Sequence, residues 1–156
     1  MTKRQKQRNR QIAIFTNMLN LAGFLAKQPA LAPVSIFLLR AFARLTIFIR
    51  KGKPQSTLEG VGKEWQRMFP SRAFVPIREN TNDTVFAEIL GECPVTGSGD
   101  VHACFRLMEY DRQLLKHIGG EFVVLQSKAD PSISVCRVAM RMKNADMSDL
   151  IPAHEK

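Results

Sequence analysis

The chain has 156 residues, of which 45% are hydrophobic and 24% are charged, with nine glycines and eight prolines. This composition is typical of a globular protein and excludes collagen-like and low-complexity disordered chains, and the length provides for one domain with a short appendage. Three cysteines, an odd number without secretory context, argue against a disulfide scaffold, so we expect reduced thiols and a cytoplasmic location.

The net charge of +9 is distributed unevenly. Residues 1–58 contain eleven lysines and arginines and no carboxylate, since the first acidic residue is Glu59. The rest of the chain carries twelve basic and fourteen acidic residues. No motif that reads base edges accompanies the basic segment, so we expect no sequence-specific binding of nucleic acid.

The N-terminal segment predicts two helices. Residues 2–11 are polar and basic, and we expect them to be frayed or bound to a surface. Two apolar runs follow, residues 12–26 and 34–49, and the prolines Pro29 and Pro33 between them predict a bend. Each run is shorter than the roughly 20 residues that cross a bilayer, so we do not expect a membrane span.

Three interpretations of this segment remain open. Its apolar side chains enter an anionic membrane surface while Arg40 and Arg44 meet the headgroups, which would place the protein peripherally on the inner face of the membrane. Alternatively, the same side chains pack on the folded domain or on another subunit of a homo-oligomer. The third interpretation is a signal peptide, because Ala30-Leu31-Ala32 resembles a cleavage site, although Lys27 weakens the apolar stretch.

A segment rich in turn formers and charge, residues 51–56, predicts a boundary between a basic apolar helical segment, residues 1–53, and an α+β domain, residues 54–156. A short helix is expected over residues 57–69. The spacing of apolar residues then changes to the two-residue period of strands. Strands are expected at residues 73–79, 83–92, 121–127 and 132–142.

The strongest helix pattern covers residues 101–118, with Asp100 as the N-cap and Gly119 after the last turn. The order strand, strand, helix, strand, strand predicts an α+β fold. In this fold N-terminal helices are followed by an antiparallel sheet with one long helix packed on it.

The long helix places an acid in its buried row. At 100° per residue, Asp111 lies on the same apolar stripe as Cys104. A fold keeps a carboxylate there for a structural ion pair or hydrogen bond, or for chemistry. Cys136 lies on the uncharged face of the last strand, and Cys93 lies at the mouth of the glycine loop that leads into the helix. We therefore predict that three thiols converge on Asp111.

Two kinds of chemistry fit this cluster. As a catalytic centre, Cys104 is the first candidate nucleophile because a helix N-terminus lowers the pKa of a thiol, and Asp111 would move protons. As ligands, the three cysteines lack a CxxC pair, so no local turn places two of them together. A metal on the cysteines stays open, and no other cofactor is predicted.

Glu92-Cys93-Pro94, Cys104 with Asp111 seven positions later, and the closing strand at residues 134–139 resemble the L-2-amino-thiazoline-4-carboxylic acid hydrolase family. The resemblance covers about residues 60–142 and implies an α+β domain behind N-terminal helices. It also implies ring-opening hydrolysis of a cyclic amidine-like carbon–nitrogen bond in a small substrate. The residues that it assigns to the site are Cys93, Cys104, Asp111 and Cys136, with Arg137 as a partner for the substrate carboxylate.

The last strand departs from the family pattern, since it reads Cys-Arg-Val where Cys-Asp-Phe is expected. A cysteine-dependent hydrolase is the function that we expect first. The alternatives are a non-enzymatic protein that binds a small ligand or metal and attaches to a membrane through its N-terminal segment, and a purely structural interaction module.

Overall fold

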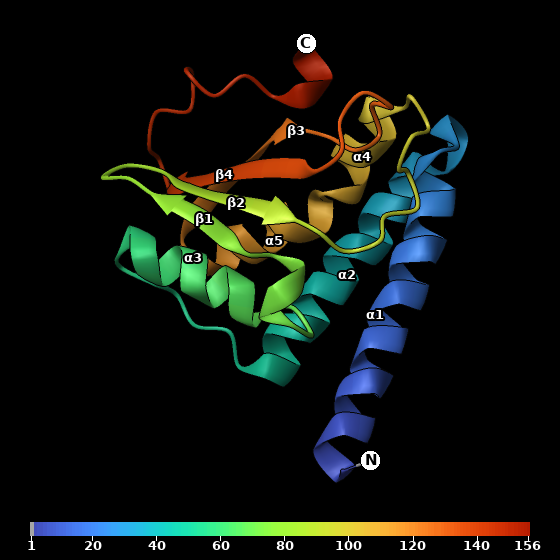
Figure 1. Ribbon diagram of the computed structural model, residues 1–156, viewed down its shortest axis with the longest axis horizontal. Coiled ribbons are helices and arrows are strands. Elements are labelled where there is room, and N and C mark those ends of the chain that lie inside the picture. The colour runs from blue at the N-terminus through green and yellow to red at the C-terminus, as the bar shows by residue number, and fades with distance from the viewer. Residues whose placement is uncertain (1) are drawn as a thin grey trace.

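An antiparallel sheet forms the centre of the computed structural model, which describes residues 2–156 (Figure 1). Its strands lie in the order β1-β2-β4-β3. They are β1 (Ile77–Asn80), β2 (Val85–Ile89), β3 (Gly120–Gln126) and β4 (Cys136–Met142). The helices cover one face of the sheet and the C-terminal tail runs along the other (Figure 1). The predicted α+β class is confirmed.

The prediction of one long helix over residues 101–118 is wrong in one respect, because this segment forms two helices. These are α4 (Val101–Leu107) and α5 (Glu109–Ile118). Met108 between them has φ −73° and ψ 4°, which turns the chain without a glycine or proline. The predicted ends are confirmed, since the Asp100 side chain accepts a hydrogen bond from the Ala103 N–H and Gly119 has φ 103°.

The N-terminal segment forms a helical hairpin of α1 (Lys3–Ala26) and α2 (Ala32–Arg50), joined by the 3₁₀ turn η1 (Pro29–Leu31). The expectation of a frayed start is wrong, because the polar stretch contains no glycine or proline and Thr2 caps α1. The hairpin packs on α4 and α5. Arg40 Nε lies 2.7 Å from Glu109 Oε1 across this contact.

The remaining elements differ from the expected ranges at their ends. Helix α3 (Leu58–Arg67) agrees with the short helix expected at residues 57–69. The 3₁₀ turn η2 (Arg72–Phe74) replaces the start of the first expected strand, so β1 begins after Pro76 at the sheet edge, where a missing N–H is tolerated. The last strand begins only at Cys136, because the turn after Pro131 extends further than expected.

The apolar core lies between the sheet and the helices. Trp65 from α3 and Leu114 from α5 are fully buried in it, and so are Val138 and Met140 from the inward row of β4. Leu39 of α2 belongs to the same cluster. The N-terminal hairpin is thus part of the core that supports the sheet.

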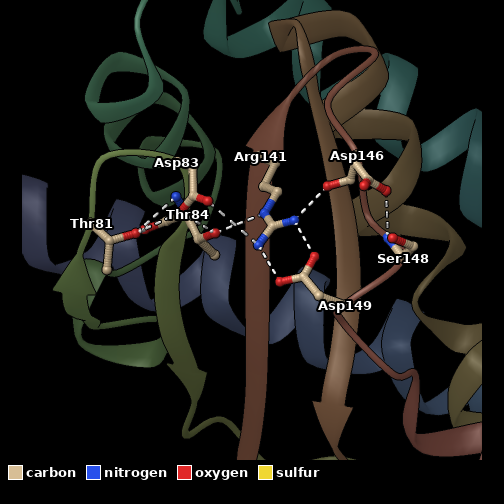
Figure 2. A network of polar contacts seen from close by, with 7 residues as sticks. All are labelled: Thr81, Asp83, Thr84, Arg141, Asp146, Ser148 and Asp149. Atoms are coloured by element: carbon tan, nitrogen blue, oxygen red, sulfur yellow. Dashed lines mark hydrogen bonds and ion pairs between the residues drawn. The ribbon is translucent and has the colours of Figure 1, made fainter.

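On the opposite face of the sheet, one buried arginine holds the C-terminal tail. The guanidinium of Arg141 donates two hydrogen bonds to the Asp149 carboxylate, of 2.5 and 2.8 Å, and one of 2.8 Å to Thr84 Oγ1 (Figure 2). It also donates to the backbone carbonyl of Asp146. These bonds attach the tail, including η3 (Ala153–Glu155), to the sheet.

Candidate functional site

The predicted buried acid lies at the centre of the helix layer. Asp111, in the first turn of α5, is 5% exposed, and its Oδ1 accepts a hydrogen bond of 2.9 Å from Nε1 of Trp65. Trp65 reaches this position because α3 presents Val61 and Trp65 on one buried face. The acid has a structural partner and is held in one orientation.

Burial raises the pKa of Asp111 to about 6, because the ionised form is poorly solvated. The Trp65 N–H and the charge of Arg112 act in the opposite direction. A carboxyl group with this pKa exchanges its proton near neutral pH, as general acids and bases do.

Two of the three thiols share a cavity with this acid. Cys93, in the loop after β2, and Cys136, the first residue of β4, line a cavity of about 50 Å³ together with Asp111. The rest of the lining is mostly apolar and includes Phe15 and Leu19 of α1. The volume admits no more than a few water molecules, so the cavity is closed to a substrate in this conformation.

Cys104 lies beside this cavity but lines another one, of about 200 Å³, under the C-terminal tail. The expectation that its helix position lowers its pKa is wrong. Burial raises the pKa of Cys104 to about 12, assisted by the negative charges that Cys136, Cys93 and Asp111 can carry, and a Ser127 hydrogen bond opposes the rise. The desolvation of a thiol 2% exposed outweighs the dipole of a helix of seven residues.

Cys93, Cys136 and Asp111 thus line one cavity and Cys104 lines another, and the charges of the first three groups act on Cys104 only by raising its pKa. Cys93 is the half-buried member. Burial raises its pKa, whereas the Val95 N–H and the charges of Lys128 and Lys27 favour its thiolate. Cys93 is therefore better suited than Cys104 to react as a thiolate.

Arg137 lies apart from this cluster. It is exposed and lines a cavity of about 450 Å³ on the tail-covered face of the sheet, opposite Glu88 on the neighbouring strand. Asp111 belongs to the helix layer on the other face. The structure does not bring Arg137 to the cavity that contains Asp111.

Sequence reasoning missed several residues around the thiols. Trp65 gave a usable signal, since it is the single tryptophan and lies on the buried stripe of an amphipathic helix. His154 lines the same cavity as Cys104 and stacks on Phe105 at 3.9 Å between ring centroids. Nothing in the sequence pattern places a histidine from the last six residues beside α4.

No group of three or more His, Cys, Asp and Glu side chains within residues 2–156 is arranged to hold a metal ion. Comparisons of the chain with protein-family models, with curated proteins and with solved structures give no match.

A second unusual feature is the outward side of the N-terminal hairpin. Large apolar side chains are exposed there, with Phe48 at 81%, Phe37 at 70% and Phe24 at 60%. By length and composition the helical segment Pro29–Arg50, with a mean hydropathy of 1.7, is able to cross a membrane, and 22% of its most apolar stretch is buried in the protein. Core helices of soluble proteins, which are mostly buried, and signal sequences near the N-terminus have the same length and composition.

Proposed function

We propose that the protein is a cysteine-dependent hydrolase of a small, cyclic amidine-like compound, with the cavity around Asp111 as its active site. The observation that carries this proposal is a buried carboxyl group, whose pKa burial raises to about 6, beside the thiols of Cys93 and Cys136 in one cavity. Strongly perturbed acids beside nucleophiles are typical of active sites. The resemblance of residues 92–139 to the thiazoline carboxylate hydrolases supports the same class.

In this proposal Cys93 supplies the nucleophile. Its thiolate attacks the amidine carbon, the ring bond from that carbon to nitrogen breaks, and Asp111 gives its proton to the departing nitrogen. Water then attacks the same carbon, which is now bound to the Cys93 sulfur, and gives a proton to the Asp111 carboxylate. The bond from this carbon to the Cys93 sulfur breaks, and the Cys93 thiolate leaves. Cys136 lines the same cavity and contacts the bound compound.

The test is turnover of 2-amino-thiazoline-4-carboxylate by the full-length protein, followed by mass spectrometry as the gain of one water. We expect Cys93→Ser and Asp111→Asn to abolish turnover. Cys104→Ser, which changes a thiol outside this cavity, is expected to keep most of it. Activity that survives Cys93→Ser and is lost in Cys104→Ser would place the reaction in the neighbouring cavity, and a wild-type protein without turnover would contradict this substrate.

We propose further that the protein attaches peripherally to the anionic inner face of a membrane through its N-terminal hairpin. The exposed apolar side chains of α1 and α2 belong to residues 1–58, a segment with eleven basic residues and no carboxylate. Apolar insertion combined with basic residues is how interfacial helices bind anionic bilayers. Arg40 and Arg44, in the interior of α2, disfavour a span.

Flotation of the full-length protein with phosphatidylglycerol vesicles tests this attachment. We expect the wild type to float, and a Phe37→Ser/Phe48→Ser variant to stay in the dense fraction. Ile151→Ser is the matched control, because Ile151 is exposed on the tail, away from the hairpin. Membrane attachment without turnover would favour the second candidate function, a membrane-attached binding protein.

A further inference from the structure

Helix α1 connects the Asp111 cavity with the exposed apolar side of the N-terminal hairpin, because the two sides of the helix face different surroundings. On its inner side, Phe15 and Leu19 form part of the wall of the Asp111 cavity. On its outer side, Leu21 and Phe24 are more than half exposed. Whatever binds the outer side of α1 therefore acts on a helix that closes the cavity.

The helix is held most firmly at its C-terminal end. Its fully buried residues, Ala22, Gly23 and Ala26, all lie in its last two turns. There the Ser35 hydroxyl donates to the Ala22 carbonyl at 2.9 Å, and Arg106 Nε donates to the Ala26 carbonyl at 2.8 Å. The N-terminal end projects beyond the sheet (Figure 1), and residues 3–11 are exposed.

Between the buried end and the projecting end, α1 packs on the body through Phe15, Met18 and Leu19, which are partly buried. The Phe15 ring lies 5.8 Å from the rings of Phe69 and Tyr110 and 6.2 Å from that of Phe42. In the N-terminal half, Arg50 donates a hydrogen bond of 3.3 Å to Oε1 of Gln11. Such contacts open more readily than the packed end of the helix.

Phe15 and Tyr110 also line a second space, a groove of about 300 Å³ between α1 and α2. Ile14, Leu45 and Ile49 line the outer part of this groove. The same two aromatic residues thus separate the closed cavity from an apolar groove on the surface. Movement of Phe15 with α1 would join the two spaces.

Charge identifies the partner of the outer side. Basic residues lie at the N-terminal end of α1, at the C-terminal end of α2 and just after α2, and the hairpin contains no carboxylate. These residues are Lys3, Arg4, Lys6, Arg8, Arg10, Arg44, Arg50, Lys51 and Lys53. A second copy of the chain would bring like charges together, which disfavours a symmetric contact. An anionic bilayer complements both the charge and the exposed apolar side chains.

We infer that α1 is a lid over the Asp111 cavity and that an anionic bilayer opens this lid by binding the outer side of the α1–α2 hairpin. The inference adds regulation to the proposed hydrolase and gives a substrate access to a cavity that is otherwise closed. The opening itself is a structural event that can be measured without turnover.

The experiment measures alkylation of the full-length protein by N-ethylmaleimide, resolved by residue with mass spectrometry. Cys136 reports on the cavity, since it lines the cavity and is 1% exposed. Cys104 is the internal control, because it is equally buried but lines the space under the tail. With phosphatidylglycerol vesicles we expect labelling of Cys136 to accelerate about tenfold, in proportion to the open population. Phosphatidylcholine vesicles and Cys104 are expected to show no change.

Three variants make the test specific. Phe15→Ala should accelerate labelling of Cys136 without vesicles, and Leu19→Ala provides a second, smaller change in the same wall. Phe37→Ser/Phe48→Ser should keep the basal rate and lose the response to vesicles.

The inference is overturned if the protein does not bind the anionic vesicles, if it binds them with an unchanged rate at Cys136, or if Cys104 accelerates equally, which indicates general unfolding. A vesicle response at Cys136 in a protein without turnover supports the lid and contradicts only the proposed hydrolase.

Discussion

At the residue scale, Asp111 is held between two opposing effects. Burial favours its neutral form, whereas the hydrogen bond from Trp65 Nε1 favours the ionised form. Burial prevails and raises the pKa of Asp111 to about 6 from an ordinary value of 3.8. Between these two values the unfolded chain is ionised while the folded protein still holds the proton, so folding is linked to proton uptake.

This linkage predicts a pH-dependent gain from Asp111→Asn. The contribution of Asp111 to the stability of the wild type is fully present below about pH 4 and is lost as the pH rises to about 6, by about 3 kcal/mol in total. Asparagine does not ionise and keeps an acceptor for Trp65, so the variant should exceed the wild type by up to about 3 kcal/mol at pH 7 and match it near pH 4. Urea unfolding at both pH values measures the difference.

The matched control is Asp130→Asn. Hydrogen bonds from the Ser132 N–H and hydroxyl lower the pKa of Asp130, so its linkage has the opposite sign and its contribution is lost as the pH falls. Parallel pH profiles for Asp111→Asn and the wild type would contradict a raised pKa at Asp111.

The thiols provide a second prediction at this scale. Cys93 is half-buried with cations nearby, whereas burial raises the pKa of Cys104 to about 12. Iodoacetamide at pH 8, in the absence of lipid, should therefore label Cys93 first and Cys104 last, by at least about tenfold, since the thiolate is the reactive form. Labelling in urea, where the three rates should converge, is the control. Fastest labelling at Cys104 would restore it as the reactive thiol.

At the scale of elements, the contact of α1 with the loop after β2 depends on one glycine. A Cβ at Gly23 would lie 2.1 Å from Cγ of Pro94 and 2.7 Å from its Cβ. The proline ring belongs to the loop that carries Cys93. Close approach at this point therefore fixes the anchored end of α1 against the loop of the candidate site.

Gly23→Ala should therefore destabilise the protein, although the same change in an exposed helix stabilises it by about 1 kcal/mol. We expect a loss of about 1–3 kcal/mol, because the ring of Pro94 or the helix must move. Asn20→Ala, at an exposed position of the same helix, should be neutral or slightly stabilising. Denaturant unfolding measures the stability of both variants. A Gly23→Ala variant as stable as the wild type would mean that the ring of Pro94 moves away without loss of stability.

At the scale of the whole molecule, the sheet is covered differently on its two sides. Helices bury the face that carries Val138 and Met140, and the tail covers the other face through Arg141. The guanidinium of Arg141 bridges Thr84, the residue before β2, and Asp149 of the tail (Figure 2). A single side chain thus joins segments that are 65 positions apart in the sequence.

Removal of this bridge should release the tail. In Arg141→Gln we expect hydrogen exchange of residues 146–156 to rise about tenfold and the melting temperature to fall, because buried charge-assisted bonds are lost. Lys143→Gln, at an exposed position after the same strand, should change neither. Unchanged exchange of the tail in Arg141→Gln would mean that other contacts hold it.

The site and the fold differ in how far the sequence predicted them. Helical spacing was enough to place Asp111 in a buried row, and strand alternation was enough to turn Cys136 inward, because both depend on local periods. The break at Met108 escaped prediction, since neither glycine nor proline marks it. The partner of Asp111 also escaped, because Trp65 lies 46 positions away in the chain.

By itself, the sequence determined the α+β class, the inward acid and the basic, apolar character of the N-terminal segment, which are properties of composition and short-range periodicity. Only the tertiary structure decided which thiols share a cavity with Asp111, how burial outweighs the helix dipole at Cys104, and that α1 lines this cavity. These features depend on desolvation and on contacts between distant segments, and neither quantity is defined until the chain has packed.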